Sequence, residues 1–108
     1  MMKLNTECYE KEGKIMSDLI RYAGKAEGRV QGVGFRMFVQ QHARELHLTG
    51  WVANMEDGSV DMELQGEEAA IEKLDKIIRA GNYFIRVKSF SLEEIPVIPG
   101  ENDFKIRY

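Results

Sequence analysis

The clearest regularity in the sequence is the alternation of apolar and polar residues around Val60, Met62 and Leu64. A period of two predicts a strand with one buried face. Other segments repeat apolar residues every three to four positions, as amphipathic helices do, or form short apolar runs bounded by glycine and proline. These patterns predict strands over residues 20–31, 49–55, 59–65 and 83–95, helices over 36–47 and 67–80, and a short last strand containing Phe104 and Ile106.

The predicted elements follow one another in an order that favours a particular fold class. Each helix has one apolar face, and these faces comprise Phe35, Val39, Ala43 and Leu46 in the first helix and Ala70, Leu74, Ile77 and Ile78 in the second. Asp57-Gly58 predicts a hairpin turn, and broken alternation predicts a bulge near Ser89. The order βαββαβ, with a short extra C-terminal strand, predicts an α+β ferredoxin-like sandwich in which two helices cover one face of an antiparallel sheet.

The beginning of the chain lacks this regularity. Residues 1–18 mix lysines and glutamates with polar residues and show no clear period. We interpret them as a flexible N-terminal extension and residues 19–108 as one domain. Met16 followed by Ser17 is a candidate start of translation, which an intact-mass measurement matching residues 1–108 would exclude.

The composition excludes several classes of function. A formal net charge of −3 gives no overall attraction to nucleic acid or to an anionic membrane. No apolar run reaches the roughly 20 residues of a membrane span, and there is no apolar stretch typical of a secretory signal, so we expect a cytoplasmic protein. Cys8 is the only cysteine. His42 and His47 are five residues apart and do not share a helix face, so a metal site is not expected.

The segment from Gly28 to Arg36 is the strongest candidate for a site. It links a predicted strand to a predicted helix, and its glycines would let successive backbone N–H groups point at one spot, which forms an anion-binding nest. The helix that follows adds unpaired N–H groups and the positive end of its dipole. Arg36 is disfavoured by that dipole unless an anion lies between the two. The alternative is a tight turn with an exposed arginine.

Asn54 is a second candidate, near the end of a predicted strand and just before the hairpin turn. Its amide could bind a water or a substrate oxygen. The alternative is an asparagine that only flanks a turn.

These two segments resemble the signatures of the acylphosphatase family. The first reads Gly28-Arg29-Val30-Gln31-Gly32-Val33-Gly34-Phe35-Arg36, and the second reads Gly50-Trp51-Val52-Ala53-Asn54, followed by Gly58, Val60 and Gly66. The ending Phe104-Lys105-Ile106-Arg107-Tyr108 is also similar to the family's last strand. The resemblance covers residues 20–108, and Ala26, where a larger aliphatic residue is common, is a mild departure.

The resemblance implies an acid-anhydride hydrolase that converts acyl phosphates to a carboxylate and inorganic phosphate, without a metal or another cofactor. It implies that Arg36 is the catalytic, phosphate-binding arginine and that Asn54 positions the attacking water. The substrate phosphate would be bound by the backbone of Gln31, Gly32, Val33, Gly34 and Phe35. A small-molecule acyl phosphate would be the partner, inorganic phosphate the product and competitive inhibitor, and the protein a monomer that binds neither nucleic acid nor membrane.

A site with one arginine, one asparagine and backbone N–H groups suits acyl phosphates as substrates. The conjugate acid of a carboxylate leaving group has a pKa of about 4, so the group leaves without a general acid. The rival interpretation is a non-catalytic ferredoxin-like module that binds phosphate or RNA. An RNA-binding sheet face needs aromatic residues in a pattern that is absent here. A related rival is an acylphosphatase-like domain that serves a larger carbamoyl-transfer maturation protein, although the cysteine clusters of such proteins are missing from this chain.

Overall fold

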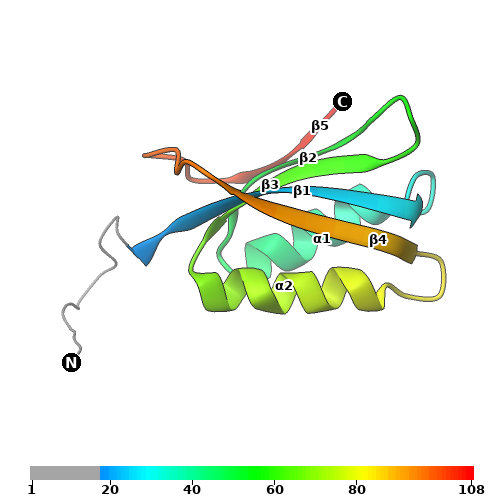
Figure 1. Ribbon diagram of the computed structural model, residues 1–108, viewed down its shortest axis with the longest axis horizontal. Helices are drawn as coiled ribbons and strands as arrows, with labels where there is room; N and C mark the ends of the chain where they lie inside the picture. Colours follow the sequence, from blue (N-terminus) through cyan, green and yellow to red (C-terminus); the bar gives the residue numbers. More distant parts are fainter. Residues whose placement is uncertain (1–17) are drawn as a thin grey trace.

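The computed structural model describes residues 18–108, which form a sheet with both helices on one of its faces (Figure 1). The predicted extension falls, up to residue 17, outside the described residues, as do Cys8 and the candidate start Met16. The elements are β1 (Ile20–Arg29), α1 (Phe35–Glu45), β2 (Thr49–Asn54), β3 (Val60–Gly66), α2 (Glu68–Ala80), β4 (Arg86–Ile95) and β5 (Phe104–Arg107). The predicted ferredoxin-like α+β architecture is confirmed.

The sheet has the strand order β4-β1-β3-β2-β5. The pairs β1–β3, β1–β4 and β2–β3 are antiparallel, whereas β2 and β5 are parallel, so the expectation of a fully antiparallel sheet is wrong at this edge. The cause is the connection of residues 96–103, which turns back at the end of β4 and crosses to the far edge of the sheet. A strand that returns in this way runs antiparallel to β4. Because β2 also runs antiparallel to β4, the last strand is parallel to β2.

The core lies between the sheet and the two helices. In β3, the alternating residues Val60, Met62 and Leu64 are at most 1% exposed, which confirms the predicted face. The helices contribute two sets of buried residues: Phe35, Val39 and Ala43 from α1, and Ile71, Leu74 and Ile78 from α2. The predicted faces are therefore mostly right, but Ile71 was missed, and Leu46, Ala70 and Ile77 are only partly buried.

Element boundaries differ from the prediction where local turns compete with the regular structure. Helix α1 ends at Glu45 because His47 adopts a positive φ of 59° and the N–H of Leu48 donates to the carbonyl of Ala43, which closes the helix in a Schellman-like turn. Strand β4 starts only at Arg86. The side-chain oxygen of Asn82 accepts hydrogen bonds from the N–H groups of Phe84 and Ile85 and keeps these two residues in a turn.

The predicted bulge is present. Glu27 pairs with Ser89, but the next residue, Gly28, pairs with Val87, so Lys88 is the extra residue on β4. The bulge lies where β1 approaches its end and the glycine loop begins.

No helix within residues 18–108 is both long and apolar enough to cross a membrane.

The sheet face opposite the helices carries a buried arginine that the sequence did not reveal. Arg21 is 0% exposed. Its guanidinium donates from Nε to Glu63 Oε1 at 2.9 Å, and from Nη1 to Glu101 Oε1 at 2.7 Å and to Gln65 Oε1 at 3.1 Å. The Gln65 side chain also exchanges two hydrogen bonds with the backbone of Ile98. Arg21 and Gln65 thus fasten residues 96–103 over one end of this face.

Replacing Arg21 is expected to destabilise the fold strongly. Arg21→Met leaves Glu63 and Glu101 without their shared cation and should lower the free energy of unfolding by about 3 kcal/mol, near the low end for a broken buried pair because both carboxylates keep some exposure. Lys25→Met is the matched control: its ion pair with Asp61 is partly exposed and should contribute at most about 1 kcal/mol. Equal losses in denaturant titrations of the two variants would contradict this account.

Candidate active site

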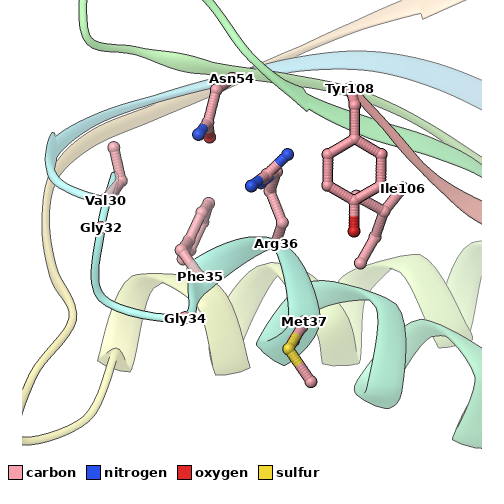
Figure 2. A pocket seen from close by; sticks show the side chains of 9 residues that line it. All are labelled: Val30, Gly32, Gly34, Phe35, Arg36, Met37, Asn54, Ile106 and Tyr108. Carbon is pink, nitrogen blue, oxygen red and sulfur yellow. The ribbon is translucent and has the colours of Figure 1, made fainter.

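A small pocket opens where the loop after β1, the first turn of α1, the end of β2 and the last strand meet (Figure 2). Its volume is about 150 Å³. The lining residues are Val30, Gly32, Gly34, Phe35, Arg36, Met37, Asn54, Ile106 and Tyr108. The structure therefore brings together the two segments that the sequence analysis singled out separately.

The backbone of the loop has the alternation that an anion nest requires. Gly32 and Gly34 have positive φ angles of 73° and 81°, while Val33 between them does not. A Cβ atom added to either glycine would meet nothing within 4 Å, so the space beside both is open. Glycine is needed here for its backbone conformation, and this alternation turns successive N–H groups toward one side.

The start of α1 leaves further donors unpaired. Gly34 is the N-cap residue, no side chain caps the helix, and the first turn holds no acidic residue. The first helical hydrogen bond runs from the N–H of Phe38 to the carbonyl of Gly34 at 3.0 Å. The N–H groups before Phe38 have no carbonyl partner within the helix. An anion in the pocket would meet these donors and the positive end of the helix dipole.

Arg36 brings the one full positive charge to the pocket lining. Its Nη1 donates to the carbonyl of Arg107 at 3.4 Å, and its guanidinium carbon lies 4.8 Å from the centroid of the Tyr108 ring. None of the ion pairs formed within residues 18–108 includes Arg36. Its charge is therefore not neutralised by a carboxylate of the described chain, and a bound anion could take that place.

Asn54 is the last residue of β2, and its side chain projects toward Arg36 across the pocket (Figure 2). The side chain is exposed and makes no hydrogen bond to any other described residue. An amide in this position can donate to one oxygen and accept from another, but it cannot take a proton as a base. It is suited to holding a water molecule near a group bound by the loop.

The predicted phosphate-binding residues do not all line the pocket. Gly32, Gly34, Phe35 and Arg36 do, whereas Gln31 and Val33 are absent from its lining. The carboxamide of Gln31 points elsewhere, and Nε2 donates to the carbonyls of Met55 and Ser59. No local sequence signal indicates these two contacts, because the partners lie 24 and 28 residues further along the chain.

The sequence analysis also missed an apolar wall of the pocket. Val30, Ile106, Met37 and Tyr108 form it, and Met37 is 69% exposed. Ile106 comes from β5, which reaches the site because it pairs with β2. The local pattern predicted that strand but not its neighbour.

The histidines are placed away from the pocket lining. His42 makes an edge-on contact with Phe38 and lies 3.4 Å from a carboxylate oxygen of Glu45, and His47 lies in the turn that follows α1. Within residues 18–108, no group of three or more His, Cys, Asp and Glu side chains is arranged to hold a metal ion. The polar side chains that line the pocket are those of Arg36, Asn54 and Tyr108, and backbone N–H groups add further donors.

Comparisons with known proteins show what this chain is similar to. A family model described as acylphosphatase matches residues 22–106. The chain is 50% identical over 82 residues to an acylphosphatase of Geobacillus thermodenitrificans, which is 76% of this chain and 87% of that protein. It is similar to the crystal structure of acylphosphatase from Bacillus subtilis, with a TM-score of 0.78 and 38% identity over 82% of this chain and 99% of that chain. Full-length HypF, solved in a phosphate- and nucleotide-bound form, matches with a TM-score of 0.76 and 32% identity over 83% of this chain but 12% of that chain.

Proposed function

Because the chain belongs to the acylphosphatase family, we propose that it hydrolyses the carboxyl-phosphate bond of acyl phosphates in the pocket between the glycine loop, Arg36 and Asn54. The products are a carboxylate and inorganic phosphate. One observation supports this location of the active site. Backbone N–H groups without a helical partner, the guanidinium of Arg36 without a carboxylate partner and the amide of Asn54 all line one small pocket.

The loop and Arg36 bind the phosphoryl group in this proposal. Backbone N–H groups from the loop and from the first turn of α1 donate to its oxygens, and the guanidinium of Arg36 supplies a charge-assisted, bidentate contact. Inorganic phosphate would occupy the same donors and so act as a competitive inhibitor. Full-length HypF, 12% of which matches this chain, was itself solved in a phosphate- and nucleotide-bound form.

The substrate itself explains how so few groups suffice. A carboxylate is a good leaving group and departs without being protonated. Phosphoryl transfer through a loose transition state depends mainly on positioning and on stabilising the charge of the equatorial oxygens. Donors that are already fixed in the loop provide this without reorganisation during the reaction.

Asn54 orients the attacking water in line with the bond that breaks. Because an amide does not accept the proton of that water, a phosphate oxygen of the substrate is the nearest acceptor, and the proton leaves with the inorganic phosphate. A pH profile of kcat that reveals an essential enzyme base with a pKa near 7 would contradict this step.

We propose that the protein is a monomer, as the family resemblance implies. Sedimentation analysis that reports a dimer would overturn this. We also propose a cytoplasmic location, supported by a sequence whose single cysteine allows no internal disulfide. Acyl phosphates are the proposed small-molecule partners, with no role for nucleic acid or membrane.

The second candidate function is phosphate binding without hydrolysis, as in a domain of a larger protein. The match to 12% of the HypF chain favours it, whereas the match to 99% of the Bacillus subtilis acylphosphatase chain favours an enzyme that acts alone. The two candidates share the nest and differ in whether a bound acyl phosphate is turned over.

Hydrolysis of benzoyl phosphate in the presence of EDTA separates these candidates. We expect turnover without any added metal, and we expect inorganic phosphate to inhibit it competitively. Phosphate binding without turnover would support the second candidate, and the absence of both would contradict the proposed site.

Arg36→Gln is expected to weaken both binding and turnover, because it removes a charge that contacts the phosphoryl group throughout the reaction. We expect kcat/KM to fall by roughly 10³-fold and phosphate inhibition to weaken. Arg44→Gln is the matched control, since Arg44 lies on the same helix but pairs with Asp103 away from the pocket. A similar loss in both variants would indicate a general effect of charge rather than a specific contact.

Asn54→Ala is expected to lower kcat by roughly 10²-fold while KM and phosphate inhibition stay nearly unchanged, because it removes only the group that orients water. Asn102→Ala, at an exposed asparagine outside the pocket lining, provides the control. Unchanged activity in Asn54→Ala would remove Asn54 from the mechanism.

A further inference from the structure

The carboxamide of Gln31 connects two segments that are far apart in sequence. Its Nε2 atom donates to the carbonyl of Met55 at 2.8 Å and to the carbonyl of Ser59 at 2.8 Å. A primary amide has two N–H groups, so both are used. The side chain is half-buried. Gln31 therefore makes a two-point contact rather than a loose surface one.

The two accepting carbonyls form the base of the turn between β2 and β3. The N–H of Met55 donates to the carbonyl of Ser59 at 2.9 Å, and the N–H of Gly58 donates to the carbonyl of Met55 at 3.2 Å. Each carbonyl thus already has a backbone partner, and Gln31 adds a second bond to each. The contact holds the turn at the point where it joins both strands.

Further hydrogen bonds brace this turn. Asp57 Oδ1 accepts the N–H of Ser59 at 2.9 Å and the hydroxyl of Ser59 at 2.5 Å. Lys25 Nζ donates to the same hydroxyl at 3.0 Å. The two bonds from Ser59, with the nearby positive charge of Lys25, hold the pKa of Asp57 below its usual value. A turn braced in this way transmits the position of its base to the residue before it.

The residue immediately before the turn is Asn54, and the residue immediately after Gln31 is Gly32 of the nest. Strands β1 and β2 are not neighbours, since β3 lies between them in the sheet. Apart from Gln31, the loop and the strand end that holds the amide are linked less directly, through β3 and through the bond from Arg36 to Arg107 of β5, which pairs with β2. Gln31 supplies a direct connection between them at the level of the pocket.

We propose that Gln31 is a positioning residue: through Met55 and Ser59 it sets the distance and angle of the Asn54 amide relative to the phosphoryl group held by the nest. The proposal rests on the proposed hydrolysis. Orienting water for in-line attack is sensitive to displacements of about 1 Å, whereas phosphate binding depends on the loop and Arg36. Loss of the Gln31 bonds should therefore affect turnover more than binding.

Gln31→Met tests this, because methionine keeps the length of the side chain and removes both donors. We expect kcat for benzoyl phosphate to fall about tenfold, with the inhibition constant of inorganic phosphate changed by less than about twofold. Gln31→Glu, which faces the two carbonyls with a carboxylate, should lose at least as much. Gln40→Met is the matched control, since Gln40 also donates to a distant carbonyl, that of Phe104, at 3.0 Å.

The decisive measurement repeats Gln31→Met in the Asn54→Ala background. If Gln31 acts through Asn54, its replacement should lower kcat by less than about twofold there, because the group that it positions is already gone. An equal loss in both backgrounds, or a loss in Gln31→Met matched by Gln40→Met, would overturn the positioning role. Full activity in both Gln31 variants would also overturn the positioning role.

Should Gln31→Met fail to fold, Gln31→Glu gives the same comparison. Hydrolysis by the unmodified chain shows that the proposed function holds even if the Gln31 proposal fails, and its absence would overturn both.

Discussion

The passage from β1 into α1 is the constraint on which the site depends. The chain has only residues 30–34 in which to leave the sheet and start a helix on one of its faces. It turns by giving Gly32 and Gly34 positive φ angles, and this leaves the N–H groups of the loop and of the first helical turn without partners in the fold. In the proposed function, this requirement of the connection supplies the donors of an anion-binding site.

This origin of the site explains how an acidic chain can handle an anionic substrate. The net charge of −3 offers no long-range attraction. In the proposed site the attraction is local, from aligned backbone dipoles and from Arg36, which no carboxylate of the described chain neutralises. Because the proposed mechanism uses no general acid, it suits a bond whose leaving group needs none, and a simple phosphate monoester with an alkoxide leaving group would be handled poorly.

The sequence could predict the parts of this structure that local patterns encode. Strand and helix periods, the hairpin at Asp57-Gly58 and the glycine loop before Arg36 all depend on residues close together in the chain. Features formed by distant residues could not be read in this way. The burial of Arg21 depends on Glu101, and the contacts of Gln31 depend on the turn after β2.

Boundary errors have a similar cause. The late start of β4 follows from the side chain of Asn82, and the early end of α1 follows from His47 in a conformation that usually calls for glycine. The apolar wall of the pocket was missed because strand order, rather than sequence pattern, brings β5 beside β2. Local sequence features made Arg36 and Asn54 candidates, and the resemblance to a family implied their roles. The structure places both in the lining of one pocket.

The central claim is that the phosphate is held by the backbone of this loop together with Arg36. Titration of the protein with inorganic phosphate, followed through the amide ¹⁵N and ¹H chemical shifts, tests that claim most directly. We predict saturable shifts concentrated at Gly32, Val33, Gly34, Phe35 and Arg36. Saturable shifts concentrated elsewhere, or none in the loop at saturating phosphate, would contradict it.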